Sequence, residues 1–470
     1  MWRVLFRRAV LIGGTVGIIG FLILVASFLM AAPPEPRCRG MSLSEWLAKS
    51  DQHTVGEGIA EIGPDAIPFL IRTLRPPHPL WNRLYTPLWK SLPQTVRTRL
   101  PWPYASERVR ENALSALREF GEEARPALPA VLKSARSDPG WLCRVFAMNA
   151  VVAIGHDEPA VASLFAVLLR DPATADAAAM APYNAATFPS NTLAYFLPAL
   201  RNRTKPPYNQ LLALSVAGPE AREAVPLIVE ALKNPQLHGN AVSAIQRIGP
   251  DAAPAVPVLI PLLEMPGSRL LVGVCEALMN IGPNAADALP ALRKLMAHDD
   301  AVVRVLAAAA VAKIGGDAKE SIPVVSAALT ANRDSQEFWI SPVRRFGLEH
   351  FSFGRLQTAA WFLGELAPDS RDALPICRKT LENCPEWLVP VLARSIWKIE
   401  GDPDEVLPLL QRSLKSKDHF TRVLACITLA EIGPAARPAL PGLEAACKIS
   451  LNTRQAARHA IRRIDAAPSR

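Results

Sequence analysis

A spacing of 33 residues recurs along this chain. Gly249, Gly282 and Gly315 lie 33 residues apart, and each is followed eight residues later by a proline. A fixed period of this length predicts stacked supersecondary units, because one such unit is too small to bury its own apolar face. Related spacings occur at Gly121/Pro129, Gly218/Pro226 and Gly433/Pro441, and without the glycine at Ala367/Pro375 and Glu400/Pro408.

Each unit predicts a pair of helices. Counted from the residue before the glycine, apolar or small residues stand at offsets 0, −3, −4 and −7, as in residues 303–315. This is the spacing of an amphipathic helix. The glycine suits a helix end that needs a positive φ, and the later proline suits the first turn of a second helix. The sequence therefore predicts an all-α fold, a right-handed α-solenoid of about ten helical hairpins with a concave face.

An arginine recurs at offset −10, and in several units an aspartate stands before it. This pattern resembles the HEAT family, specifically the short bacterial HEAT-like units of the phycobilin-lyase type. The resemblance covers about residues 43–466 and implies that the arginines are structural and link neighbouring repeats. The arginines are Arg110, Arg144, Arg304, Arg422 and Arg454, and the aspartates are Asp138, Asp300 and Asp418.

The first 32 residues form a separate segment. Arg3, Arg7 and Arg8 precede residues 9–32, which carry no charge. A helix of this length reaches about 36 Å, which exceeds the ~30 Å hydrocarbon core of a bilayer. Basic residues before the span indicate a cytoplasmic N-terminus.

The sequence therefore predicts a cytoplasmic segment 1–8, a transmembrane helix 9–32, a tether 33–42 and repeats at 43–466. The protein would be a single-pass protein of the cell inner membrane, with its repeats in the periplasm or an equivalent extracytoplasmic space. A cleaved signal peptide is the alternative, because small residues close the segment at Ala31 and Ala32. The start of the repeats also resembles that of membrane-anchored HEAT-repeat proteins of certain bacteria.

Composition argues against several functional classes. The net charge of +9 becomes +6 without the three anchor arginines, which is weak for a nucleic-acid-binding protein. The seven cysteines include no Cys-x-x-Cys pair, the eight histidines include no His-x-x-x-His pair, and no phosphate loop or nucleophile elbow is present. We therefore expect no metal, no cofactor, no catalytic residue and no nucleic-acid partner.

Three segments interrupt the 33-residue spacing, near residues 75–106, 171–209 and 333–355. The first combines basic residues with aromatic ones, which favours a position on the membrane interface. A loop packed on the first repeats is the alternative. The second is small and aromatic, without evident chemistry. The candidate interface residues of the first segment are Trp81, Tyr85, Trp89, Trp102 and Tyr104.

The third interruption carries aromatic residues and arginines, the residue types that dominate binding hot spots. It leads into the helix predicted to present Trp361. Folding back onto the solenoid is the alternative to a partner site. The candidate partner-binding residues are Trp339, Arg344, Arg345, Phe346, Phe351, Trp361 and Arg394.

Two columns of each first helix are expected to point to the concave face, at offsets −5 and −1. Both mix charges and sizes, which suits a protein or peptide better than a nucleic acid. The −5 column is Ser115, Asn149, Ser243, Glu276, Ala309, Trp361, Arg394, Ile427 and His459, and the −1 column is Glu119, Ala153, Arg247, Asn280, Lys313, Glu365, Lys398, Glu431 and Arg463.

The function predicted from these features is a membrane-anchored protein-protein interaction scaffold that presents a concave repeat surface and is not an enzyme. The alternative is an enzyme subunit or lyase-like protein with a site at the 333–355 interruption. Cytosolic nucleic-acid binding would require the opposite membrane topology.

Overall fold

The computed structural model describes residues 35–49, 58–59, 61–75, 91, 106–201, 207–315, 318–330, 339–340, 352–449 and 451–466. The predicted membrane span 9–32 lies outside these residues. The candidate interface residues Trp81, Tyr85, Trp89, Trp102 and Tyr104 lie outside them too, as do Arg344, Arg345, Phe346 and Phe351.

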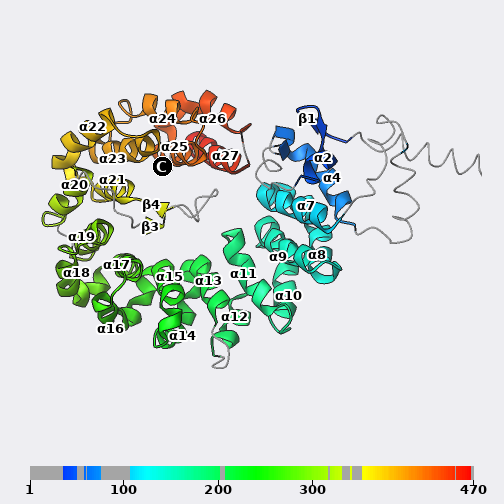
Figure 1. The fold of residues 1–470 in the computed structure, drawn as a ribbon, viewed down its shortest axis with the longest axis horizontal. Helices are drawn as coiled ribbons and strands as arrows, with labels where there is room; N and C mark the ends of the chain where they lie inside the picture. Colours follow the sequence, from blue (N-terminus) through cyan, green and yellow to red (C-terminus); the bar gives the residue numbers. More distant parts are fainter. Residues whose placement is uncertain are drawn as a thin grey trace, which may run out of the picture.

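The described chain is an all-α solenoid of two helical layers that follows a ring (Figure 1). Inner helices stack on one another around the concave side, and each one before the last is followed by an outer helix on the rim. The inner helices are α7 (Glu107–Phe120), α9 (Trp141–Gly155), α11 (Ala175–Ala185), α13 (Tyr208–Ala217), α15 (His238–Ile248), α17 (Ser268–Ile281), α19 (Ala301–Gly315), α21 (Arg355–Glu365), α23 (Val389–Glu400), α25 (His419–Ile432) and α27 (Leu451–Asp465).

The outer helices are shorter and carry a proline in their first turn in most repeats. Proline is tolerated there because the first-turn N–H groups have no partner within the helix. The outer helices are α8 (Leu128–Ser137), α10 (Pro159–Leu168), α12 (Leu193–Leu200), α14 (Val225–Ala231), α16 (Val256–Leu259), α18 (Leu289–Leu295), α20 (Ile322–Thr330), α22 (Leu374–Glu382), α24 (Leu407–Ser413) and α26 (Leu440–Ala446).

The repeated glycine ends an inner helix, as its spacing predicts. Gly249 and Gly282 have φ of +76° and +75°, a region that residues with a side chain rarely adopt. Short 3₁₀ helices then lead to the outer helices, such as η5 (Gly249–Ala255) and η7 (Gly282–Ala288). Others are η2 (Gly121–Ala127), η3 (Gly218–Ala224), η4 (Pro235–Leu237), η6 (Ile260–Glu264), η8 (Asp369–Ala373), η9 (Glu386–Leu388) and η10 (Gly433–Ala439).

A single apolar core runs between the two layers. Its residues are small and aliphatic, and α19 is buried on nearly every side. The amphipathic faces expected from the sequence are therefore covered by neighbouring repeats, since no single hairpin could cover its own.

The segment 171–209, which the sequence set apart as an interruption, contains the helices α11 and α12. Helix α11 contacts α9 and α13, so it occupies an inner position of the stack. The glycine that ends other inner helices is replaced here by Ala186, which follows α11 and itself adopts φ +51°. The 33-residue spacing therefore failed to predict the helical pair α11 and α12.

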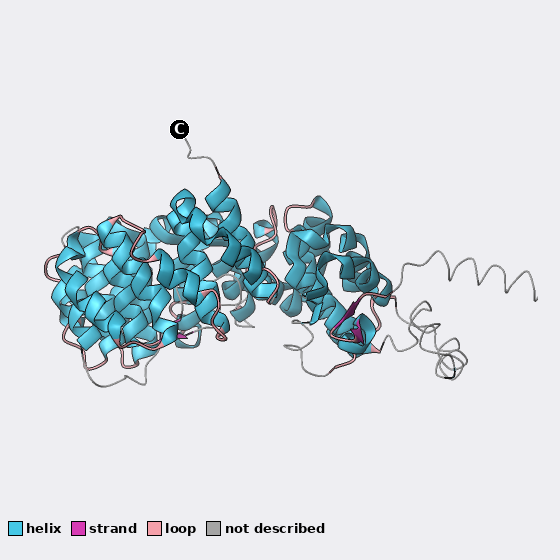
Figure 2. Ribbon diagram, turned by 90° about the horizontal axis from the view of Figure 1, so that it is seen from above, coloured by secondary structure: helices cyan, strands magenta, loops and turns pink. Residues whose placement is uncertain are grey.

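Strands are confined to two short hairpins in the part of the chain that the structure describes (Figure 2). β1 (Arg37–Cys38) pairs with β2 (Met41–Ser42) just before α2 (Leu43–Leu47), and η1 (Gly63–Ala66) and α4 (Ile67–Thr73) follow. β3 (Trp339–Ile340) pairs with β4 (Ser352–Phe353), and β4 contacts α21. Strands β3 and β4 lie on the inner side of the ring in Figure 1.

The two ends of the solenoid meet. Helix α27 lies beside α7, where Gln455 Nε2 donates a hydrogen bond to the backbone oxygen of Glu119. Arg458 forms an ion pair with Glu123 at the same place. We call these contacts between α27 and the α7–η2 segment the seam.

One stretch of the described chain is long and apolar enough to cross a membrane. It is His419–Ala446, which contains an 18-residue window with a mean hydropathy of 1.3, and 61% of that window is buried. This stretch comprises α25, η10 and α26, which bend back on each other as one repeat. Its apolar character is that of solenoid core.

Candidate functional site

The repeat register brings charged residues of four successive inner helices together on the concave side. Trp361 and Glu365 lie on α21, one helical turn apart, and Arg394 and Lys398 have the same relation on α23. Each pair occupies the −5 and −1 offsets of its repeat, so stacking sets the pairs side by side. Lys313 of α19 and Glu431 of α25 extend the row, and we call these six residues the concave charge cluster.

Arg394 lies at the centre of this cluster. Its Nη2 donates to Glu365 Oε1 at 2.7 Å, and its Nε donates to Glu431 Oε2 at 2.8 Å. Its guanidinium carbon lies 3.7 Å from the centroid of the Trp361 ring, the geometry of a cation–π contact. The side chain is only 4% exposed. One guanidinium therefore joins three inner helices.

The lysines extend the network toward its edges. Lys398 Nζ lies 2.8 Å from Glu365 Oε1 and 3.8 Å from Glu431 Oε2, while Lys313 Nζ lies 3.6 Å from Glu365 Oε2. Lys313 is 42% exposed, so it presents charge to solvent at the rim of the cluster. The cluster is thus buried at Arg394 and open at its lysine end.

The electrostatics keep Glu365 ionised. Burial alone would raise the pKa of its carboxyl, but the positive charges of Arg394 and Lys398 outweigh burial and lower the pKa to about 2. A carboxylate with this pKa does not exchange protons near neutral pH. The arrangement therefore fixes the negative charge of Glu365, whose carboxylate does not serve as a general acid near neutral pH.

Arg394 retains one unused donor. Its Nη1 is buried and has no hydrogen-bond partner among the residues that the structure describes. The two strands of the 333–355 interruption lead directly into α21, which carries Trp361. Trp339, the remaining candidate of this segment, belongs to β3, and only its backbone is described.

The concave columns differ from the expectation in one respect. The −1 residues are exposed or half-buried, whereas several −5 residues are buried. Side chains of the next inner helix contact two of them, since Asn184 donates to Asn149 and Arg394 lies over the Trp361 ring. The buried members include Asn149, Glu276, Trp361 and Arg394.

Four of the recurrent arginines hold the turn that precedes their own inner helix. Arg304 Nη1 donates to the backbone oxygens of His298 and Asp299 at 2.6 and 2.8 Å. Arg144, Arg422 and Arg454 make equivalent bonds, to the backbone oxygens of Asp138, of Ser416 and Lys417, and of Cys447. These bonds satisfy carbonyl groups at or just beyond the ends of the outer helices, which have no partner within the helix.

Arg110 pairs with an aspartate of the next repeat. Its Nε and Nη2 donate to the two carboxylate oxygens of Asp138 at 3.0 and 2.9 Å. Both side chains are almost fully buried, so this bidentate pair ties α7 to the start of α9.

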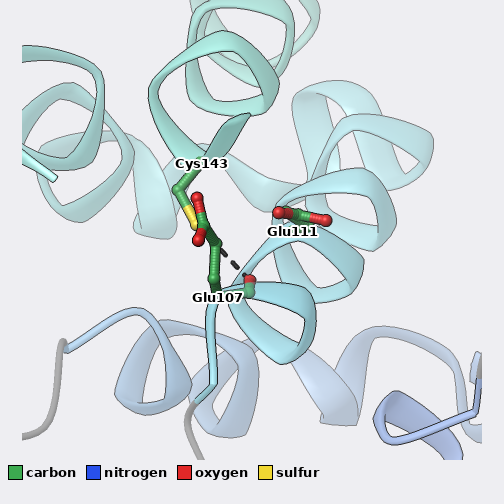
Figure 3. Close-up of side chains that lie close together, drawn as sticks. All are labelled: Glu107, Glu111 and Cys143. Carbon is green, nitrogen blue, oxygen red and sulfur yellow. Dashed lines mark hydrogen bonds between the residues drawn. The ribbon is translucent and has the colours of Figure 1, made fainter. Parts of the chain in front are cut away.

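A second group of polar side chains lies at the start of α7. Glu107, Glu111 and Cys143 have ligand atoms within 4.8 Å of one another, and Figure 3 shows the thiol directed at the backbone of Glu107. The thiol donates to the Glu107 oxygen at 3.4 Å, and burial raises its pKa to about 12. A metal ion would have to displace this proton beside the guanidinium of Arg110, so the donor set fits a metal poorly.

The sequence placed Glu365, Lys398 and Glu431 in the concave columns but did not pair them with Trp361 and Arg394. The one-turn spacing within each helix could have linked Trp361 to Glu365 and Arg394 to Lys398. The contacts between helices needed the structure, because they depend on how far each inner helix is shifted along its neighbour.

Comparison with known proteins gives one family match, in which residues 225–312 correspond to HEAT repeats. No curated protein matches the chain. Among solved structures, the chain is similar to Kap121p in the crystal structure of Kap121p bound to Nup53p, with 13% identity and a TM-score of 0.39. The alignment covers 90% of this chain and 60% of that one, so this chain spans about 60% of the length of that protein. The matched repeats and the two-layer helical stack together support a HEAT-repeat protein.

Proposed function

We propose that this protein is a membrane-anchored scaffold that holds a protein partner on its concave face and has no catalytic activity of its own. The observation that carries the proposal is the set of exposed −1 residues on the concave side, which carry charges of both signs. They include Arg247, Lys313 and Glu431. Mixed charge gives a partner register and specificity.

Several charges of the outer rim are paired between repeats as well. Arg125 is paired with Asp157, Arg293 with Glu320, and Arg378 with both Glu400 and Glu405. Each pair joins an outer segment to the turn of the next repeat. These charges tie the repeats together, as those of Arg394 do on the concave side.

The membrane part of the proposal rests on the sequence. The uncharged residues 9–32 would anchor the chain, with the N-terminus in the cytoplasm and the repeats outside it. A reporter enzyme that is active only outside the cytoplasm, fused to the C-terminus, tests this orientation. We expect activity, and an inactive fusion with an active cytoplasmic counterpart would reverse the topology.

Site-specific photo-crosslinking in the native membrane tests the partner surface. A photoreactive amino acid would replace Arg247, Asn280 or Lys313, exposed residues of the −1 column. Matched controls would carry it at Lys133, Glu230 or Lys294, exposed residues of the outer helices. We expect one discrete adduct from the concave positions only. Equal adducts from both faces, or none from either, would contradict the proposal.

A further inference from the structure

The seam differs in kind from the other contacts between repeats. Within the stack, α27 buries Ala456, Ala457, Ala460 and Ile464 almost completely. At the seam, the contacts given by the structure are polar: Gln455 to the backbone of Glu119, and Arg458 to Glu123. The side chains of Arg458 and Glu123 are 40% and 32% exposed, so water and salt screen their attraction.

The seam also contains an unfavourable element. The side chain of Arg454 is buried, and its Nε donates to the backbone oxygen of Cys447. Its Nη1 has no acceptor within the described chain, and a Cβ placed on Gly63 of η1 would lie 3.8 Å from it. Burial of the Arg454 guanidinium disfavours its charged form and therefore lowers its pKa. The described part of the first repeat therefore helps to desolvate a charge without supplying its counterpart.

Favourable and unfavourable contacts thus oppose each other across a small interface. Screened ion pairs contribute little, and a buried unpaired donor is unfavourable. The free energy of closing the ring is consequently close to zero, whereas the apolar stacking on either side of the seam is clearly favourable.

We propose that α27 is a releasable latch, which closes the solenoid into a ring around the concave face and opens to admit the protein partner. The role of the latch in admission rests on the proposed function. The latch itself is a property of the isolated chain and can be measured without a partner.

Energy transfer between two dyes on the full-length protein in detergent measures the latch. Dyes attached through non-natural amino acids at Glu122 of η2 and Arg462 of α27, both exposed, would report the distance across the seam. Glu123→Arg and Arg458→Glu would each place like charges together. We expect each to raise the ratio of open to closed molecules at least about fivefold, the factor equivalent to about 1 kcal/mol. The double exchange, Glu123→Arg with Arg458→Glu, should restore the wild-type ratio.

Arg293→Glu provides the matched control. It breaks the ion pair between Arg293 and Glu320, which has similar exposure and joins two neighbouring repeats far from the seam. It should leave the ratio unchanged. The latch would be refuted if the single variants matched wild type, or if the double exchange failed to restore closure. Transfer that varied with protein concentration would also refute it, because the contact would then join separate molecules. These outcomes do not depend on the crosslinking result, so either proposal can fail alone.

Discussion

Glu365 offers the sharpest test of the concave charge cluster. Replacement by glutamine keeps the size of the side chain and removes the charge that Arg394 and Lys398 contact. The carboxyl has its pKa lowered from 4.5 to about 2 in the folded protein. A difference of about 2.5 pKa units corresponds to about 3 kcal/mol in the free energy of unfolding at neutral pH.

The sign of the pH dependence follows from the direction of this pKa change. The folded state holds the charged carboxylate more strongly than the unfolded state does. The contribution of Glu365 is therefore fully present above pH 4.5, and it is lost as the pH falls from 4.5 toward 2. Glu365→Gln should be about 3 kcal/mol less stable than wild type at pH 7. Its stability should nearly equal that of wild type near pH 2.

Urea denaturation followed by circular dichroism, at pH 7 and at several values below pH 4.5, measures this difference. Glu230→Gln is the control, because Glu230 pairs with Lys233 on an exposed helix surface and is 56% exposed. Its loss should change stability by about 0.5 kcal/mol or less at any pH. A Glu365→Gln effect below about 1 kcal/mol at pH 7, or one that persisted unchanged in acid, would refute the electrostatic reasoning.

Three further predictions concern the framework. Gly249→Ala should lower the melting temperature and reduce the free energy of unfolding by about 1 kcal/mol or more, because an alanine would be forced to φ +76°. Gly239→Ala is the control and should leave the melting temperature unchanged, since Gly239 lies in the first turn of the same helix and an added Cβ would meet no atom within 4 Å. Asp138→Ala should lower the unfolding free energy in urea by about 3 to 5 kcal/mol, since Arg110 would be left buried without its carboxylate, and a change below 1 kcal/mol would argue against that pairing. Cys143, Cys275 and Cys377 should resist iodoacetamide at pH 8 in the folded protein, because burial raises each thiol pKa to about 12, whereas the half-buried Cys384 and Cys447 should react first; mass spectrometry of labelled peptides, with urea-unfolded protein as reference, decides between them.

The helical hairpins were predictable because their boundaries are set locally. A glycine with positive φ and a proline in a first helical turn act within a few residues of their own position. The pair α11 and α12 shows the limit of this reasoning. Ala186 takes a left-handed conformation at the end of α11 without the glycine that marks other repeats, so nothing in the spacing announced a repeat there.

The concave charge cluster was predictable only in its parts. The periodicity placed Trp361 and Arg394 at equivalent positions of successive repeats, but the Arg394 contacts with Glu365 and Glu431 depend on the stacking of three helices. The burial of Arg394 follows from that stacking as well. Long-range geometry of this kind is absent from the local pattern of one sequence.

The seam affects how readily the two ends of this solenoid fray. Linear repeat arrays fray from their terminal units, each of which has a neighbour on one side only. Here α27 and the α7–η2 segment cover part of each other, although Gln455 and Glu119 are 336 positions apart. The last repeat therefore acts as a partial cap for the repeat of α7, and trimming α27 would expose the part of that repeat that it covers.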